Sequence, residues 1–431
     1  MTRHFQTLIV GSGPAGIAAA VCAAQHSNGA DSNVGLIDDN PAAGGQIWRR
    51  GPGKAADASH AGIEAHWRER LLGSNITQLQ GWSVFDRPLA NTLRAERLGE
   101  ASDFRFDNLI LATGARERFL PFPGWTLPNV MGVGAIQAMV KGGLPIRGKR
   151  VVIAGSGPLL LAVAAALRSA GAIVECICEQ ASLSQLLPFV FSLVSDPGKI
   201  AQGIRYKSAT WKVPFYTSCW PIRAEGDTQL RRVTLSRRGH LLQIACDYLA
   251  CGFHLVPNVE LAAMLGCRIG NGGVVVDEWQ QTTAPRIYCV GESTGIGGLE
   301  LSLLEGQIAG LTVVGQKNKA RAMFGRRRRL SRFASHLTKG FALRPELRAL
   351  PVEDTFVCRC EDVSYGDLRR HDSWRAAKLH TRCGMGPCQG RICGGATEFL
   401  LGWNADSVRP PVSPALVSSL ASSSGHVEFD E

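Results

Sequence analysis

The chain has 431 residues, of which 45% are hydrophobic and 7% aromatic, and its formal net charge is +11. This length predicts two or three domains, while the few aromatic residues disfavour a base-stacking surface and the lack of an apolar run of roughly 20 residues disfavours a membrane span. Much of the positive charge lies between Lys317 and Arg332, which predicts a solvated face or a docking surface for an acidic partner rather than a nucleic-acid interface.

The N-terminal residues lead directly into an apolar run and show no small-residue cleavage site of a secretory signal. We therefore expect a cytoplasmic protein, and attachment to the inner face of the cytoplasmic membrane stays open. The chain contains thirteen cysteines. In that compartment they are expected to be reduced thiols or metal ligands, not a disulfide framework.

The first predicted elements form a strand–turn–helix–strand unit. A strand at residues 6–10 is followed by the turn Gly11-Ser-Gly-Pro-Ala-Gly16, a helix of small residues at 17–25 and a second strand at 34–37. Glycines at this spacing permit a tight turn, close approach of a pyrophosphate and close helix packing, and the helix N-terminus favours an anion. An acid after the second strand can accept hydrogen bonds from ribose hydroxyls. The unit predicts a nucleotide site formed by Gly11, Gly13, Pro14, Ala15, Gly16, Asp38 and its neighbour Asp39.

Three further segments resemble the glutathione- and thioredoxin-reductase class and identify the nucleotide as FAD. Pro41-Ala-Ala-Gly-Gly-Gln46 is similar to its flavin-facing turn, Ala112-Thr-Gly114 to its returning strand, and Gly291-Glu292 to its distal motif, where an acid, usually Asp, holds the ribityl chain. That class's paired redox cysteines are missing from this part of the chain, and Cys176 and Cys178 are interpreted as core residues, so electrons are not expected to leave through a disulfide. The resemblance implies FAD contacts at Gly45, Gln46, Ala112, Thr113, Gly114, Gly291 and Glu292.

A second unit repeats the first about 140 residues later. A strand at 150–154 precedes the turn Gly155-Ser-Gly-Pro-Leu-Leu160, a helix and a strand that ends near Glu179. Leu160 replaces the third glycine and should crowd a nicotinamide dinucleotide, and no Arg follows Glu179 to receive a 2′-phosphate. NAD, a different adenine nucleotide and a domain that only shapes an interface stay open as alternatives.

The two units predict an α/β fold of two doubly wound nucleotide-binding domains of the glutathione/thioredoxin-reductase type, the second inserted into the first. The FAD domain is expected to comprise residues 1–125 and 270–315, and the second, NAD-like domain residues 126–269. Residues 316–351 are basic and weakly periodic, so they are predicted to be a linker. A small helical domain is expected at residues 352–404.

Five of the thirteen cysteines fall in residues 352–404, before a Ser- and Pro-rich tail at 405–431. We expect this tail to be extended, partly disordered or packed on a neighbour. Thiolates are soft anionic ligands that suit iron. Zinc sites usually space paired cysteines by two to four residues, so Cys358-Arg-Cys360 favours an iron–sulfur cluster over zinc. Cys388 and Cys393 supply a second pair among glycines.

These two pairs resemble the small helical [2Fe-2S] domain of the bacterioferritin-associated ferredoxin type. The resemblance implies that Cys358, Cys360, Cys388 and Cys393 are the metal ligands. The second pair here is C-x4-C where the small ferredoxin has C-x2-C, which leaves the individual assignments open. Cys383 is interpreted as a bystander close to the site, at a position that is often Ala, although its spacing from Cys388 would let it compete.

Longer segments extend the resemblance over most of the chain. Residues 109–137, 251–261 and 381–391 are similar to the α subunits of bacterial heteromeric amino-acid dehydrogenases. These include opine oxidase, dye-linked proline dehydrogenase and D-hydroxyproline dehydrogenase, and a subunit of hydrogen cyanide synthase is a relative. In that family a β subunit of the amine-oxidase type carries its own FAD and oxidises the C–N bond. The resemblance implies an α subunit that receives the electrons and passes them through FAD and a [2Fe-2S] cluster to an acceptor.

Further partners and other functions stay open. Some family members bind an FMN between subunits, and a small third subunit is a candidate partner. The sequence shows no acid–base pair at a substrate pocket, so no catalytic residue is predicted. One alternative function is a self-sufficient NADH-dependent flavin reductase, which Leu160 disfavours. Others are a hydrogen cyanide synthase subunit with the same cofactors and a non-enzymatic protein with a zinc site.

Overall fold

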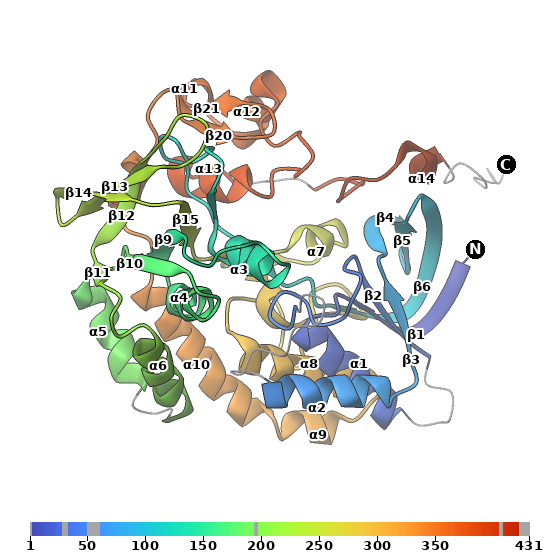
Figure 1. The fold of residues 1–431 in the computed structure, drawn as a ribbon. Helices are drawn as coiled ribbons and strands as arrows, with labels where there is room; N and C mark the ends of the chain where they lie inside the picture. Colours follow the sequence, from blue (N-terminus) through green and yellow to red (C-terminus); the bar gives the residue numbers. More distant parts are fainter. Residues whose placement is uncertain (1, 28–32, 50–60, 194–196, 405–407, 422–431) are drawn as a thin grey trace.

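The first nucleotide-binding unit is built on a seven-stranded sheet, whose strands β1 to β6 are labelled in Figure 1. The strand order is β3-β2-β1-β6-β5-β4, and β19 also pairs with β6. The computed structural model describes residues 2–27, 33–49, 61–193, 197–404 and 408–421. Strands β3, β2, β1, β6 and β19 run parallel to their neighbours in this group, whereas β4, β5 and β6 form an antiparallel meander. Their bounds are β1 (Thr2–Val10), β2 (Val34–Asp38), β3 (Ile76–Gln80), β4 (Ser83–Leu89), β5 (Thr92–Arg97), β6 (Glu100–Leu111) and β19 (Ile287–Cys289).

Two helices distant in sequence pack together against this sheet. The chain returns to the first unit through β19, the short 3-10 helix η2 (Gly291–Ser293) and α8 (Leu299–Val313), and α8 lies against α1 (Pro14–His26). A side chain at Gly306 would overlap the carbonyl of Ala15. Small residues therefore let the two backbones approach closely. The other elements of this unit are α2 (Ala61–Leu72), α7 (Glu260–Met264), β17 (Ile269–Gly270) and β18 (Gly273–Val274).

The second unit contains a five-stranded parallel sheet in the order β11-β10-β9-β15-β8. Its central strands are almost completely buried and rich in Val, Ile, Ala and Cys, as expected of a parallel sheet covered on both faces. The sheet strands are β8 (Val130–Gly132), β9 (Arg150–Ser156), β10 (Ile173–Glu179), β11 (Phe215–Thr217) and β15 (Tyr248–Phe253). The helices are α3 (Val133–Lys141), α4 (Leu159–Ser169), α5 (Leu183–Ser192) and α6 (Pro197–Ala209).

Two smaller sheets complete the second unit and its connection to the first. Strands β12 (Cys219–Glu225), β13 (Arg232–Arg237) and β14 (His240–Ala245) form an antiparallel sheet, and β7 (Ala115–Glu117) pairs with β16 (Leu255–Pro257). The predicted α/β class with two doubly wound units is confirmed. The domain boundaries stay a prediction.

Residues 316–351, predicted to be a linker, contain α9 (Lys317–Arg321), α10 (Phe324–Gly340) and η3 (Pro345–Ala349). Phe324 and Leu330 are buried in the core of the first unit, and Leu347 and Leu350 in that of the second. The ring of Phe341 lies 5.2 Å from that of Phe189 on α5. The segment therefore packs on both units along most of its length. Its basic composition gave no indication of this packing.

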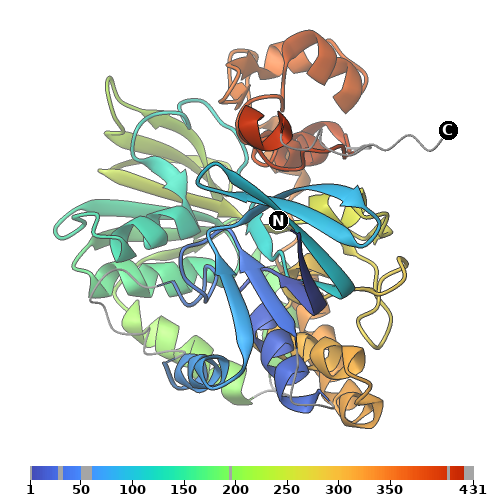
Figure 2. The same cartoon turned by 90° about the vertical axis from the view of Figure 1, so that its right-hand side faces the viewer.

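The cysteine-rich region lies at one end of the molecule in both views (Figures 1 and 2). It contains β20 (Phe356–Cys358), β21 (Val363–Ser364), α11 (Tyr365–Leu368), α12 (Trp374–Thr381) and α13 (Cys393–Leu401). In the tail, Val412 is buried and its N–H donates to the carbonyl of Phe85. The helix α14 (Val417–Ala421) follows. Residues 405–407 and 422–431 of the predicted tail lie outside the described part of the chain. Among the described residues, no helix combines the length and apolarity that crossing a bilayer requires.

Candidate cofactor sites

The glycine turn of the first unit brings three of the predicted flavin segments together. Gly11 has φ +104°, and a side chain there would overlap the carbonyl of Ala112. A side chain at Gly16 would overlap the carbonyl of Gly11. A Cβ built at Gly45 would lie 2.9 Å from Cα of Gly13. These positions therefore need glycine for steric reasons, and they place the turns at 11–16 and 44–45 beside the end of β6.

The space in front of this turn is open. A Cβ added at Gly13 would meet no atom within 4 Å. Pro14 begins α1, so its missing N–H costs no helical hydrogen bond. Gly13 is also the N-cap residue of α1, and the unpaired N–H groups of a helix N-terminus favour an anion such as phosphate. Gln46 is exposed.

Asp38 and Asp39 have different surroundings. Asp38 is buried and accepts hydrogen bonds from the N–H and hydroxyl of Ser12 and from the N–H of Asn40. Asp39 is exposed, and one of its carboxylate oxygens accepts from the Asn40 amide. Asp38 thus holds the turn in place, whereas Asp39 is free to meet a ligand. Which of the two reaches a ribose stays a prediction.

The distal motif presents a carboxylate oxygen without a partner. Oε1 of Glu292 accepts from the N–H of Gly298 at 2.7 Å. Its Oε2 is shielded from solvent and has no hydrogen-bond partner among the described residues. Burial raises the pKa of Glu292 to about 7. Buried polar atoms are normally satisfied, so this oxygen fits a site where a hydroxyl-bearing cofactor supplies the missing donor.

Hydrogen bonds fix Thr113 and Gly114 to neighbouring segments. The Thr113 hydroxyl donates to the carbonyl of Asn258 at 2.7 Å and lies 3.0 Å from the Ser293 hydroxyl. The N–H of Asn258 donates to the carbonyl of Gly114 at 2.9 Å. The sequence did not single out Asn258 or Ser293. Asn258 lies within residues 251–261, which carry part of the family resemblance, and Ser293 follows Glu292 of the distal motif.

The second glycine turn has a backbone similar to the first, but the side on which a nucleotide would bind is covered by other residues of the chain. Glu179, at the position of Asp38, accepts from the N–H groups of Gly157 and Ala181 and from the Ser156 hydroxyl. Burial raises the pKa of Glu179 to about 7. Leu160 is buried where the first turn has Gly16.

Residues 341–344 fill the space beside this second turn. Gln180, at the position of Asp39, is completely buried. Its Nε2 donates to the carbonyl of Ala342 at 3.1 Å, and its Oε1 accepts from the N–H of Arg344 at 3.1 Å. The Ser156 hydroxyl lies 3.1 Å from the carbonyl of Phe341. The chain itself therefore occupies the hydrogen-bonding groups that a ribose would use.

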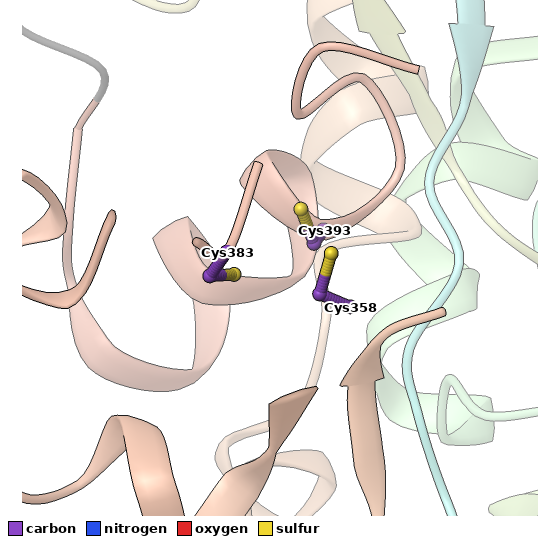
Figure 3. Close-up of side chains that lie close together, drawn as sticks. All are labelled: Cys358, Cys383 and Cys393. Carbon is purple, nitrogen blue, oxygen red and sulfur yellow. The ribbon is translucent and has the colours of Figure 1, made fainter. Parts of the chain in front are cut away.

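The cysteine-rich region gathers three thiols at one point (Figure 3). The sulfur atoms of Cys358, Cys383 and Cys393 all lie within 4.8 Å of one another, and all three residues are buried. Cys358 ends β20 and Cys393 begins α13, while Cys383 follows α12. Hydrogen bonds from the thiols of Cys383 and Cys393 hold the pKa of Cys358 at about 2. The hydrogen bond to Cys358 in turn raises the pKa of Cys383 and of Cys393. The three thiols therefore favour one thiolate, at Cys358, and thiolate is the form that binds iron.

The other two predicted ligands form a separate pair. Cys360 is exposed and its thiol contacts that of Cys388, which is half-buried. A side chain at Gly386 would overlap Cβ of Cys360, so glycine lets the loop close over this pair. The structure thus brings Cys358 and Cys393 together and places Cys383, which was expected to be a bystander close to the site, beside them. The set of four ligands stays a prediction.

The cysteine-rich region is fastened to the nucleotide-binding units at several points. Trp125 Nε1 donates to the carbonyl of Phe356 at 2.6 Å, and Arg118 Nη2 donates to Oε2 of Glu398 at 2.9 Å. Arg116 Nε donates to the carbonyl of Arg391, between Cys388 and Cys393, at 2.9 Å. The loop between Cys388 and Cys393 is therefore bonded to Arg116, which follows the flavin segment at residues 112–114 by two positions.

A glycine turn with open space before it, an unpartnered carboxylate oxygen and a second dinucleotide fold are features of a flavin-dependent oxidoreductase. The chain belongs to the pyridine nucleotide-disulphide oxidoreductase family, which matches residues 5–313. This family membership implies FAD, and the buried cysteines are compatible with an iron–sulfur cluster.

Relatives extend over the cysteine-rich region as well. The chain is 30% identical to hydrogen cyanide synthase subunit HcnB of Pseudomonas aeruginosa, over 90% of this chain and 91% of that protein. It is 29% identical to an opine oxidase subunit of Rhizobium meliloti, over 97% and 98%. Among solved structures, L-proline dehydrogenase from P. horikoshii has a TM-score of 0.68 at 20% identity, over 97% of this chain and 80% of that one. The predicted resemblance is confirmed.

Proposed function

We propose that the chain is the electron-transfer α subunit of a heteromeric amino-acid or imino-acid dehydrogenase of the opine, hydroxyproline or proline class. In this proposal a β subunit of the amine-oxidase type oxidises the C–N bond with its own FAD. The α subunit receives the electrons at its FAD site and passes them through a [2Fe-2S] cluster to an acceptor. The observation that carries the proposal is the cluster of buried thiols in a region whose cysteine loop is bonded to Arg116, two positions after the flavin segment at residues 112–114.

The residues at the first turn fit an FAD. The open side of Gly13 and the N-terminus of α1 suit the pyrophosphate, exposed Asp39 suits the ribose, and Oε2 of Glu292 is an acceptor for a ribityl hydroxyl. FAD supplies hydride and single-electron chemistry when bound. Thr113 and Gly114 are held by Asn258 and shape the backbone near that site.

The thiols fit an iron–sulfur cluster that carries one electron at a time. Cys358, Cys360, Cys388 and Cys393 are the proposed ligands. The sulfur atom of Cys383 lies within 4.8 Å of those of Cys358 and Cys393, and Cys383 is the competing fourth ligand. Tight glycine turns at Gly384 and Gly390, with φ of +79° and +77°, close the loop.

The covered second turn argues against the NADH-dependent alternative. A nicotinamide dinucleotide would have to displace residues 341–344 from Gln180 and Ser156. An adenine nucleotide at this turn would face the same contacts. Electrons are therefore proposed to enter from a partner subunit.

A hydrogen cyanide synthase subunit is the second candidate, because the HcnB relative is as similar as the opine oxidase relatives. It would use the same two cofactors, and only the reaction on the partner subunit would differ. An FMN at a subunit interface, a small third subunit, and peripheral attachment to the cytoplasmic membrane complete the proposal from the family resemblance.

The first experiment is a visible spectrum of anaerobically purified protein with iron and acid-labile sulfide assays. We expect flavin bands, a broad shoulder in the visible and about two irons and two sulfides per chain. Flavin with zinc and no sulfide would refute the cluster. Cys358→Ser or Cys393→Ser is expected to remove the iron. Comparing Cys360→Ser with Cys383→Ser decides which thiol completes the set.

The partner reaction is tested next. Co-purification with an amine-oxidase-type subunit should give a complex in which a proline, hydroxyproline or opine substrate bleaches the flavin. Release of cyanide from glycine would favour the second candidate. Complete bleaching of the isolated chain by NADH alone would contradict both.

A further inference from the structure

Arg116 joins the cysteine loop to the segments around the flavin site. Its Nε donates to the carbonyl of Arg391 at 2.9 Å, in the loop between Cys388 and Cys393. Its Nη1 donates to Oδ1 of Asn258 at 2.7 Å, and its Nη2 lies 2.8 Å from Oε1 of Glu260. All three nitrogen atoms of the guanidinium group therefore have partners, and the side chain is only 20% exposed.

Asn258 continues the connection to the proposed flavin contacts. Its Nδ2 donates to the carbonyl of Thr113 at 2.8 Å, and its N–H donates to the carbonyl of Gly114 at 2.9 Å. The Thr113 hydroxyl returns a hydrogen bond to the carbonyl of Asn258 at 2.7 Å. Two side chains, Arg116 and Asn258, thus link the backbone at residues 113–114 with the backbone at residue 391.

The chemistry of these groups suits a positioning role. Guanidinium is a planar fork with fixed donor directions and stays protonated, so it sets both the distance and the orientation of the carbonyl groups that it binds. Groups that orient ligand-bearing segments alter the properties of the metal they surround, and hydrogen bonds near a cluster tune its potential.

We propose that Arg116 is a positioning residue that holds the cysteine loop against the flavin-contact segment and so sets the rate of electron transfer between the two sites. One electron leaves the reduced flavin and enters the oxidised cluster. The flavin becomes more oxidised by one electron, the cluster more reduced by one, and any proton that the flavin loses goes to solvent. This inference rests on the proposed function, because it requires both cofactors.

Arg118 provides a matched control within the same segment. Its side chain is also 20% exposed, and its Nη2 donates to Oε2 of Glu398 on α13. It therefore helps to fasten the cysteine-rich region. Within the described part of the chain, its side chain makes no hydrogen bond to residues 113–114, Asn258 or the loop between Cys388 and Cys393. Removing Arg118 tests attachment of the region, whereas removing Arg116 tests alignment of the loop.

The experiment uses the full-length, cofactor-loaded protein with Arg116→Gln, Arg116→Lys or Arg118→Gln. The measurements are FAD, iron and sulfide content, the electron paramagnetic resonance spectrum of the reduced cluster, and the rate of electron transfer after rapid photoreduction of the flavin. We expect Arg116→Gln to keep its cofactors, to shift the spectrum and to slow transfer at least tenfold. Arg116→Lys should recover part of the rate, and Arg118→Gln should match the wild-type rate and spectrum.

Two outcomes would overturn the inference. One is a wild-type rate and spectrum in Arg116→Gln. The other is an equal slowing in Arg116→Gln and Arg118→Gln, because that would mean attachment alone matters. If Arg116→Gln loses the cluster, the inference is tested with Asn258→Ala instead. This variant removes the side-chain bonds of Asn258 to Arg116 and Thr113 but keeps the bond from Arg116 to the loop. It should slow transfer, and a wild-type rate would refute the proposal. A wild-type protein without flavin, iron or sulfide would refute the proposed function instead.

Discussion

Replacing Arg327 with methionine is expected to destabilise the first unit by about 3 kcal/mol near pH 8, the low end of the cost of breaking a buried ion pair. Arg327 Nε lies 3.3 Å from Oε1 of Glu305, and these side chains are 20% and 4% exposed. Glu305 also accepts from the N–H of Gly291 and from the Thr294 hydroxyl, each at 3.0 Å. These two bonds remain in the variant, which is why we expect the low end of the range.

The loss of stability should depend on pH. Burial raises the pKa of Glu305, and the charge of Arg327 opposes that rise. Without Arg327 the pKa of folded Glu305 rises further above the ordinary value of 4.5. The folded variant then holds a proton that the unfolded chain releases, so its stability falls as pH increases from the unfolded pKa to the folded pKa. The deficit relative to wild type should therefore be small near pH 5 and larger near pH 8.

Arg328 is the matched control for this prediction. Its Nη1 lies 3.4 Å from Oε1 of Glu278, and the two side chains are 68% and 62% exposed. Such exposed pairs contribute about 0–1 kcal/mol. Thermal unfolding midpoints of wild type, Arg327→Met and Arg328→Met at pH 5 and pH 8 give the comparison. Equal losses in the two variants, or a deficit for Arg327→Met that is the same at both pH values, would refute the reasoning.

Two further predictions concern the second turn and the glycines. Anaerobic addition of NADH to the FAD-loaded chain should leave the flavin spectrum unchanged, because Gln180 is bonded to residues 342 and 344; bleaching with a saturable NADH dependence would show that the segment moves aside. Gly306→Ala should destabilise the protein by about 1–3 kcal/mol, since the new methyl group would overlap the carbonyl of Ala15. Gly325→Ala on α10, which meets no atom within 4 Å, should instead stabilise the protein by about 0.5–1 kcal/mol, and melting curves of both variants test the contrast.

The two nucleotide-binding units could be predicted because their signals are local. Each has an apolar strand, a glycine turn and a helix within about 30 residues, the usual span of such a unit. Gly11 and Gly155 show why the glycines are required, since both have positive φ and both face a neighbouring carbonyl. The α10 helix was missed because its apolar residues, such as Phe324 and Leu330, are interrupted by a run of arginines. Its burial comes from units distant in sequence.

The connections between the sites could not be predicted from the sequence. Arg116 binds the main-chain carbonyl of Arg391, which is 275 positions away. Any residue type supplies such a carbonyl, so the sequence carries no signal for this contact. The proximity of Cys383 to Cys358 depends likewise on how α12 and β20 pack. Cysteine spacing alone does not determine that packing.

The two glycine turns show how one fold can serve different purposes within a single chain. Both place an acid on the turn backbone, Asp38 in the first and Glu179 in the second. The next residue differs, because Asp39 is exposed, whereas Gln180 is buried under residues 341–344. This segment follows α10, which also supplies Arg327 to Glu305 behind the Gly291 motif. The beginning of α10 thus supports the proposed flavin site through Arg327, and the segment that follows the end of α10 covers the second turn. We therefore expect that truncating the segment would affect both sites at once.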